Sequence, residues 1–268
     1  VLGPRINAGG RVGKCSHGAN LLMENDPKNV FKLASELDVF NKERQDLEKK
    51  LLHEILSNLK DTSEPVIILS GTNWHEGIIG IVASRIKEKF NKPTIIISIK
   101  DNIGKASARS INGFDMGSLI IAAVQSGILI KGGGHKMAGG FSIEISKIDK
   151  FKDFANKKFN ILNTSISKIK EIMIDGSISP SALNLEFFDK IDCLAPFGSG
   201  NSEPKFLIND VKTLNSKIVG EKHIKSNLIG KDGSLVKTIA FNATESNLGA
   251  YLLKKHMTFN IVGKLSLN

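Results

Sequence analysis

A glycine-rich segment is the part of this chain whose residue types and spacing best suit chemistry. Residues 132–140 read Gly-Gly-Gly-His-Lys-Met-Ala-Gly-Gly. Consecutive glycines let a backbone approach a ligand without interference from Cβ atoms. The N–H groups of Gly133 and Gly134 can converge on an oxyanion from such a loop, and His135 can add a further donor. The alternative interpretation is a glycine-rich turn with no ligand.

A serine and an arginine upstream strengthen the first interpretation. Ser107-Ala108-Arg109-Ser110 falls in an apparent strand, so Ser107 and Arg109 point to the same side of it. A hydroxyl beside a planar guanidinium suits a phosphate or a carboxylate. Together the two motifs predict an anion-binding site.

The chain uses arginine sparingly. Lysine and arginine together number 37, and only five of these are arginine, which leaves 32 lysines. Arg5, Arg11 and Arg109 lie in motifs that contain glycine, serine or asparagine. Because lysine supplies a charge but not a bidentate fork, arginine at these positions favours phosphate binding.

The composition is that of a globular protein with a basic surface. Hydrophobic residues make up 41% and charged residues 24% of 268 residues, with a formal net charge of +10. The positive excess is spread along the chain, which favours a polyanionic partner, although a lysine-rich composition alone could produce it. No apolar run is long enough to span a membrane. The two cysteines, Cys15 and Cys193, are expected to be buried, and they fit a reducing cytoplasm without a zinc site or a disulfide.

The elements that position these motifs begin with a polar loop and two helices. Residues 3–13, which hold two arginines and one asparagine, are expected to form a glycine-rich loop. A helix is expected over 18–24, and a long helix over 27–59 with proline in its first turn. The polar centre of the long helix, around 41–45, suits a bridge between two domains.

A compact α/β unit is expected next. Its strands are predicted at 66–69, 95–99, 104–110 and 140–145, and its helices at 78–90 and 115–126, with a loop at 70–77. Alternating strands and helices predict a mostly parallel or mixed sheet with covered faces. An amphipathic helix over 148–163 leads out of this unit.

The pattern changes after about residue 168. Short strands at close spacing are predicted at 172–178, 205–214, 223–229, 236–241 and 259–265, with helices at 181–191 and 246–254. Strands around one inserted helix suggest a small β-barrel of the OB type.

Three segments together resemble the RecJ single-strand-specific DNA exonucleases of the DHH phosphoesterase superfamily. They are Gly-Pro-Arg-Ile-Asn-Ala-Gly-Gly-Arg at 3–11, Trp-His-Glu-Gly-Ile-Ile-Gly-Ile-Val-Ala-Ser-Arg at 74–85, and Leu-Ala-Pro-Phe-Gly-Ser-Gly-Asn-Ser-Glu-Pro at 194–204. The resemblance implies an α/β DHH-associated domain, preceded by a long bridging helix and followed by an OB-type β-barrel that lacks its last strand. It divides the chain into the end of the catalytic DHH domain (1–15), a helical linker (16–60), the DHH-associated domain (61–147), a connecting helix (148–167) and the OB-type domain (168–268).

The family's chemistry uses two metal ions, Mg²⁺ or Mn²⁺, for 5′-to-3′ hydrolysis of single-stranded DNA in repair and recombination. None of the six histidines here belongs to a His-His or Asp-x-Asp cluster that could hold such ions. We therefore expect the catalytic residues and metal ligands to lie outside this chain, which would be a C-terminal fragment that is inactive alone.

The resemblance implies that one group of residues binds the phosphate and strand. These residues are Arg5, Asn7, Arg11, His75, Ser107, Arg109, Gly133, Gly134 and His135. Several neighbours have structural alternatives. His75 could contact substrate or cap the following helix, and Arg85 could contact substrate or form an ordinary ion pair. Trp74 could stack on a base, but packing in the core or between domains is favoured. The aromatic residues of the barrel, Phe197, Phe206, Phe241 and Tyr251, are also expected in its core.

Two other functions stay open. One is a nucleic-acid-binding module of the same family without catalysis, and the other is a phosphoesterase for short oligonucleotides, against which the OB domain argues. The partner expected is single-stranded DNA, with a single-strand-binding protein or a helicase as a candidate protein partner. We expect a cytoplasmic monomer with no membrane contact.

Overall fold

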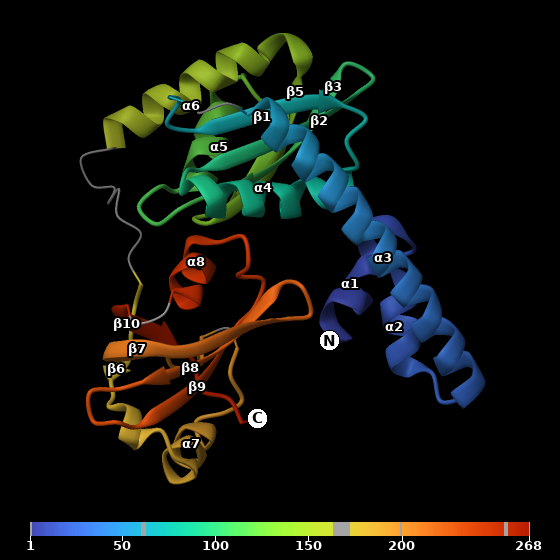
Figure 1. Cartoon of the computed structure of the whole chain (residues 1–268). Helices are drawn as coiled ribbons and strands as arrows, with labels where there is room; N and C mark the ends of the chain where they lie inside the picture. The colour runs from blue at the N-terminus through green and yellow to red at the C-terminus, as the bar shows by residue number, and fades with distance from the viewer. Residues whose placement is uncertain (1, 60–62, 163–171, 199, 255–256, 268) are drawn as a thin grey trace. The chain divides into compact units, whose positions relative to one another are not determined.

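The computed structural model describes residues 2–59, 63–162, 172–198, 200–254 and 257–267 (Figure 1). It divides into two compact units, residues 1–170 and 171–268, and each unit is considered by itself. No helix among the described residues is long and apolar enough to cross a lipid bilayer.

Three helices open the first unit: α1 (Leu2–Val12), α2 (Ser16–Met23) and α3 (Pro27–Asn58). The second and third were expected, but the expected loop over 3–13 is wrong because α1 occupies it. Ala8 and Gly9 of α1 are buried against α3. A Cβ at Gly9 would lie 3.2 Å from Leu37 Cδ2, so glycine serves close helix packing here. Tertiary contacts thus outweigh the low helix propensity of glycine.

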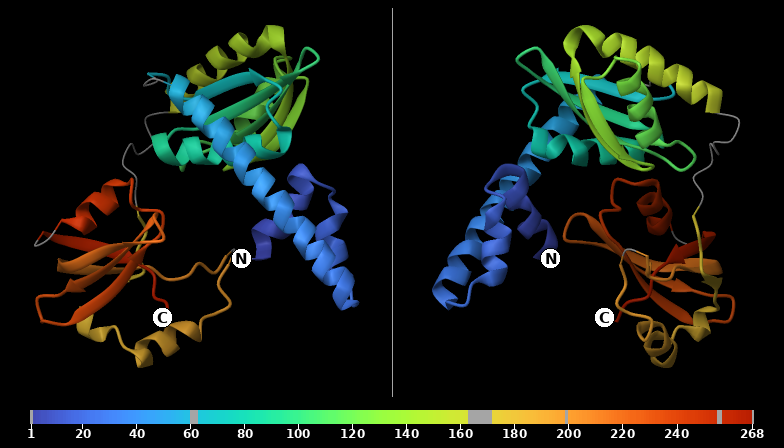
Figure 2. Two further views of the ribbon diagram at one scale, coloured as in Figure 1. Left: turned by 45° about the vertical axis from the view of Figure 1, so that its right-hand side comes forward. Right: turned by 180° about the vertical axis from the view of Figure 1, so that it is seen from behind.

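Helix α3 is the long helix predicted from the sequence. The Asp26 side chain accepts hydrogen bonds from the first-turn N–H groups, and Pro27 occupies the first helical position. The two views in Figure 2 show α3 extending from the α/β sheet to α1 and α2. Its polar middle is packed: Glu48 is buried and accepts hydrogen bonds from Arg44 Nη1 (2.7 Å) and Arg85 Nε (3.2 Å). Arg85 therefore forms the ordinary ion pair that was one of its two interpretations.

The α/β part of this unit is a five-stranded mixed sheet in the order β1-β2-β3-β5-β4. Only β1 and β2 are parallel. The strands are β1 (Ile67–Thr72), β2 (Thr94–Lys100), β3 (Ile103–Arg109), β4 (Lys131–His135) and β5 (Ala138–Glu144). The helices are α4 (Glu76–Phe90), α5 (Met116–Gln125), the 3₁₀ turn η1 (Ile145–Lys147) and α6 (Ile148–Leu162).

Hydrophobic cores cover both faces of this sheet, as the sequence predicted. Ile96 faces the core shared with α3 and α4, while its neighbours Ile95 and Ile97 face α5 and α6. This alternation follows from the two-residue period of a strand. Helix α6 buries Phe151 and Phe159 in the core that contains Ile95 and Ile97. It therefore packs on the sheet, whereas the sequence had indicated a helix that leads out of this unit.

The glycine-rich segment is a β-hairpin, so its predicted form as a phosphate-cradling loop is wrong. Gly133 and Gly134 lie in β4 and pair with Gly140 and Gly139 of β5. Helix α5 explains the glycines that face it: a Cβ at Gly132 would lie 2.8 Å from Ile120 Cγ2. Glycine is needed here for a close helix–sheet approach, whereas the sequence had suggested the close approach of a ligand or a turn.

The second unit is a curled sheet with helices at its ends. Strands β10, β7, β8 and β9 are neighbours in that order, and β6 pairs with β7. The strands are β6 (Gly176–Ser177), β7 (Phe206–Val219), β8 (His223–Ile229), β9 (Leu235–Ala240) and β10 (Thr258–Gly263). The helices are η3 (Pro180–Ala182), α7 (Leu185–Asp192) and α8 (Asn247–Leu253). The strand expected over 172–178 is only two residues long.

This sheet is an open half-barrel, as expected. Among the residues that the structure describes, β9 and β10 pair with no further strand and lie at opposite ends of the order. Its core contains Val211, Ile224 and Leu228. Two further expectations are wrong. Cys15 and Cys193 are both exposed, and so are Phe241 and Tyr251, which were expected in the core.

Candidate anion-binding site

An open cleft of about 490 Å³ in the first unit collects residues from three distant segments. Helix α1, the start of α4 and strand β3 each contribute to it. The lining residues are Asn7, Gly10, Arg11, Glu76, Gly77, Gly80, Ser107 and Arg109. Four of the nine expected site residues therefore meet here: Asn7, Arg11, Ser107 and Arg109.

Strand β3 presents Ser107 and Arg109 on one face, as their spacing predicted. Arg109 Nη1 donates hydrogen bonds to Ser107 Oγ (3.1 Å) and to the carbonyl oxygen of Ala108 (2.8 Å). These two bonds hold the guanidinium beside the serine hydroxyl. The pair forms a preorganised set of donors, which is what an oxyanion requires.

The two cleft arginines differ from the other three. Within the described part of the chain, three arginines form ion pairs with carboxylates (Arg5 with Asp38, and both Arg44 and Arg85 with Glu48). No ion pair involves Arg11 or Arg109 among those residues. Arg11 Nη1 instead donates to the carbonyl oxygen of Gly77 (3.1 Å). The cleft therefore carries two guanidinium charges without a carboxylate bound to either.

The electrostatics of Arg109 reflect this arrangement. Burial, and then the neighbouring positive charge of Arg11, lower the pKa of Arg109 from its usual value. Arginine nevertheless stays charged at any physiological pH. An anion placed between the two guanidinium groups would offset both the desolvation and the repulsion, so the geometry favours anion binding.

The glycine hairpin extends the same face of the sheet. In the strand register Ser107 lies opposite Gly140, which lies opposite Gly133, and Arg109, Ala138 and His135 form the next row. Residues directly opposite in an antiparallel pair point to the same face. A Cβ at Gly133 would meet no atom within 4 Å, so packing does not require glycine there. The surface beside Ser107 is therefore bare backbone that a ligand can approach.

Gly134 belongs to the opposite face. A Cβ at Gly134 would lie 2.5 Å from the Cα of Gly139, and would also overlap the carbonyl oxygen of Ala138. Gly134 thus has a packing role that explains it without a ligand, unlike Gly133.

Arg5 and His75 do not line the cleft. Arg5 Nε donates to Asp38 Oδ1 (2.8 Å) and fixes α1 on α3. His75 is the N-cap of α4, where its Nδ1 accepts a hydrogen bond from the N–H of Gly77 (3.1 Å). Of the two roles considered for His75, the structure therefore shows the helix cap. Trp74 is partly buried against the core of α3 and α4, as expected.

Sequence reasoning missed a carboxylate in this cleft and a lysine bound to it. Glu76 lines it and accepts a hydrogen bond from Lys105 Nζ (2.8 Å). Lys105 alternates with Ser107 and Arg109 along β3, so the same two-residue spacing could have found it. The glycines of α4, Gly77 and Gly80, were also missed, because in a helix glycine signals only weak propensity.

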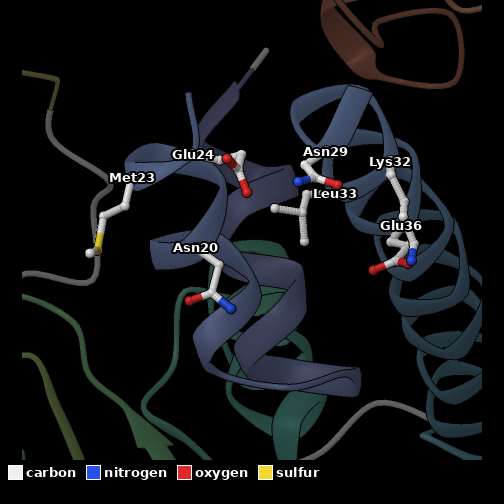
Figure 3. A pocket seen from close by; sticks show the side chains of 7 residues that line it. All are labelled: Asn20, Met23, Glu24, Asn29, Lys32, Leu33 and Glu36. Atoms are coloured by element: carbon white, nitrogen blue, oxygen red, sulfur yellow. The ribbon is translucent and has the colours of Figure 1, made fainter. Parts of the chain in front are cut away.

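A second pocket, between α2 and α3, contains none of the expected site residues (Figure 3). It has a volume of about 420 Å³ and is lined by Asn20, Met23, Glu24, Asn29, Lys32, Leu33 and Glu36. Glu36 is bonded to His17 Nε2 (3.0 Å), and Glu24 Oε1 accepts N–H groups of the turn before α3. Its carboxylates are thus occupied by local structure.

The cleft does not fit a resident metal ion. Glu76 is its single carboxylate among the lining residues, and that group is paired with Lys105. Across the described ranges no group of three or more histidine, cysteine, aspartate or glutamate side chains is placed to hold a metal. Guanidinium groups bind anions and repel cations, whereas Mg²⁺ and Mn²⁺ are bound chiefly by carboxylate and other oxygen ligands.

Family models match both units. The DHHA1 domain model matches residues 63–160, and the RecJ OB domain model matches residues 174–268. The chain therefore combines a DHHA1 domain with an OB domain of the RecJ type.

Similar whole proteins narrow the class. The single-stranded-DNA-specific exonuclease RecJ of Escherichia coli is 34% identical over 254 residues, covering 90% of this chain and 44% of that protein. The RecJ of Bacillus subtilis is 28% identical over 273 residues, covering 100% of this chain and 34% of that protein. A crystal structure of RecJ with Mn²⁺ from Thermus thermophilus superposes with a TM-score of 0.77 and 26% identity, over 99% of this chain and 38% of that one.

The chain therefore belongs to the RecJ family and corresponds to its C-terminal region. It spans less than half the length of these relatives.

Proposed function

We propose that this chain holds the single-stranded DNA substrate of a RecJ-type 5′-to-3′ exonuclease that acts in DNA repair and recombination. The observation that carries the proposal is the pair of guanidinium groups, Arg11 and Arg109, that share one cleft without a carboxylate partner among the described residues. The names of the similar RecJ proteins support the same substrate.

Each group at the cleft has a distinct task in holding a strand. Arg109 and Ser107 donate to the oxygens of one phosphate, and Arg11 approaches the same phosphate from α1. The bare backbone at Gly133 lets the sugar and its neighbour lie against the sheet. We infer that His135, at the end of the row that contains Arg109, donates to an adjacent phosphate.

The second unit offers a separate cationic surface. In the register of β7, β8 and β9, Lys217 lies opposite Lys225, and Asn215 lies opposite Asn227, which lies opposite Lys237. Like charges directly opposite one another destabilise a sheet, and a polyanion offsets that repulsion. We infer that this sheet face binds the sugar–phosphate backbone.

An exposed aromatic ring borders this sheet face, which carries Lys217, Lys225 and Lys237 and is called the lysine face below. Phe241 follows β9 and is 68% exposed, with its ring centroid 5.3 Å from that of His223 on β8. Exposed rings next to lysines are typical of surfaces on which single-strand bases stack. Stacking at Phe241 would favour a single strand over a duplex, in which bases are already stacked.

We propose that hydrolysis depends on catalytic residues and metal ligands outside this chain. Divalent metals supply the activated water in this chemistry, and similar RecJ structures contain Mn²⁺ or Mg²⁺. Because the cleft residues do not fit such an ion, we assign to this chain the binding and orientation of the strand. We expect the chain alone to leave the phosphodiester intact.

The test is a binding and cleavage experiment on the purified chain. We expect a 5′-phosphorylated single strand of about 20 nucleotides to bind more tightly than the matched duplex, with affinity falling steeply as salt rises. Incubation with Mn²⁺ should release no mononucleotide above a contaminant control. Equal affinity for duplex would remove the single-strand assignment, and release of mononucleotide would place catalysis in this chain.

The same titration separates the two alternatives. A dinucleotide that binds as tightly as the longer strand would favour a phosphoesterase for short oligonucleotides, because the lysine face would then contribute nothing. A full-length protein that binds strands but does not cut them would favour the non-catalytic module.

Compartment, assembly and protein partners complete the proposal. Two free, exposed cysteines suit the reducing cytoplasm. The resemblance to RecJ supports a monomer, with a single-strand-binding protein or a helicase as its protein partner. Sedimentation of the purified chain would test whether it is a monomer, and a dimer would contradict this proposal.

A further inference from the structure

Helix α4 has two glycines on the side that faces the cleft. Gly77 and Gly80 are three residues apart, a spacing that places them next to each other on one helix face. Both line the cleft, and each lies against one of its two arginines, which form no ion pair among the described residues. Nothing in the helix itself calls for glycine, which weakens it.

Gly77 accommodates the backbone of α1. A Cβ at this position would overlap the carbonyl oxygen of Arg11 and lie 2.9 Å from its carbonyl carbon. In return Arg11 Nη1 donates to the carbonyl oxygen of Gly77 (3.1 Å). The last turn of α1 therefore rests directly on the first turn of α4.

Gly80 accommodates the side chains of β3. A Cβ there would lie 2.8 Å from Ser107 Oγ and 2.9 Å from Arg109 Nη2. Real Cβ atoms essentially never approach other atoms this closely, so any larger residue would displace the serine–arginine pair. The guanidinium lies against the helix backbone because this position has no side chain.

We propose that Gly77 and Gly80 are positioning residues that bring the Arg11 and Arg109 guanidinium groups into register for one phosphate. The inference rests on the proposed function of the cleft and deepens it. Gly77 sets the position of Arg11 through the backbone of α1, and Gly80 sets the position of Arg109 through contact with its guanidinium.

The two glycines should respond differently to substitution. The atom that a Cβ at Gly77 would strike is backbone, so Gly77→Ala must shift α1 as a whole. The atoms near Gly80 are the ends of side chains, which can move at low cost. Gly80→Ala should therefore keep the fold and displace the guanidinium, so it is the sharper test.

A matched control exists in α1. Gly3 is also helical, and a Cβ there would meet no atom within 4 Å. Gly80→Ala and Gly3→Ala each add one methyl group to a helix, but only Gly80 lies in a helix interior, where alanine raises helix propensity, because Gly3 is in the first turn of α1 and precedes Pro4. We expect both variants to stay folded, and only Gly80→Ala to lose affinity, by about tenfold, for a 5′-phosphorylated single strand.

A double-mutant cycle tests action through Arg109. In an Arg109→Lys background, Gly80→Ala should cause no further loss, because the fork that it positions is already absent. An undiminished tenfold loss in that background would overturn the inference, as would a Gly80→Ala variant with the parent's affinity.

A readout without nucleic acid separates this inference from the proposed function. The side-chain Nε–Hε resonance of Arg109, identified by its absence in Arg109→Lys, should move in Gly80→Ala and stay in place in Gly3→Ala. If that resonance does not move, the positioning role is refuted. If it moves while the parent binds no single strand, the proposed function fails and the positioning role stands.

Discussion

Replacing Arg109 with lysine keeps the charge of the cleft and removes its planar fork. In the structure Nη1 already donates to Ser107 Oγ and to the carbonyl oxygen of Ala108, and Nη2 lies beside Gly80. A lysine ammonium places all its donors at one point, so it cannot hold Ser107 and a phosphate in the same arrangement. We expect Arg109→Lys to weaken binding of a 5′-phosphorylated single strand.

The size of the loss follows from the bonds involved. One hydrogen bond to a charged group contributes about 1.5 to 3 kcal/mol, which corresponds to roughly 10- to 150-fold in affinity. The salt dependence should be unchanged, because the charge is kept. Arg109→Gln should instead reduce the slope of log affinity against log salt by about 0.7, the value for one phosphate contact on a single strand.

Fluorescence anisotropy with labelled oligonucleotides at several salt concentrations measures both quantities. Arg85→Lys is the matched control, since Arg85 is bound to Glu48 outside the cleft and its replacement should leave affinity unchanged. Equal affinity of Arg109→Lys and the parent would remove Arg109 from the phosphate site. A reduced salt slope in Arg109→Lys would show that charge, not geometry, is what the position contributes.

Three further predictions concern other charges. Glu76→Gln should raise affinity for single strands severalfold and steepen the salt dependence, because it removes a negative charge from the cleft and frees Lys105 beside it; weaker binding in the same anisotropy titrations would contradict this. Lys225→Ala should weaken binding equally for different sequences and lower the salt slope by about 0.7, without lowering the unfolding midpoint, because it also removes a repulsion across the β7–β8 pair; unchanged binding would exclude this sheet face. The hydrogen bond that the Asp115 carboxylate accepts from the N–H of Ser118 holds the pKa of Asp115 below 3.8, so its stabilisation is present above that pH and is lost as pH falls through the lowered value. Asp115→Asn should therefore be less stable than the parent at neutral pH but lose less stability between about pH 5 and pH 3, and parallel acid unfolding curves by circular dichroism would refute this.

Elements with a strong hydrophobic period were predictable from the sequence. Helix α3 keeps apolar residues at helical spacing on both sides of its polar centre, and strand β8 has the predicted bounds. In both, local pattern and final packing agree, so no distant contact was needed to find them. The alternation of Ser107 and Arg109 was predictable for the same reason.

Glycine-rich segments were not predictable, because their structure depends on what packs against them. Helix α1 and strand β4 both contain glycines that read locally as loops. Each is regular because another helix lies too close for a side chain, α3 in one case and α5 in the other. The position of Arg5 was not predictable for a similar reason. Its side chain is bound to Asp38, which lies 33 residues away in sequence, and no local pattern indicates that contact.

Helix α3 determines the width of the cleft, because both walls of the cleft are attached to it. The α1 wall of the cleft is fixed to α3 near Asp38, while the wall formed by α4 is fixed to it at Glu48. These anchors are ten residues apart, or about 15 Å along the axis. A bend of about 5° between them would shift one wall by roughly 1.3 Å, enough to break a hydrogen bond. The distance between Arg11 and Arg109 therefore depends on α3 being straight. A substitution that bends α3 would change this distance and weaken binding, although it would alter no residue of the cleft.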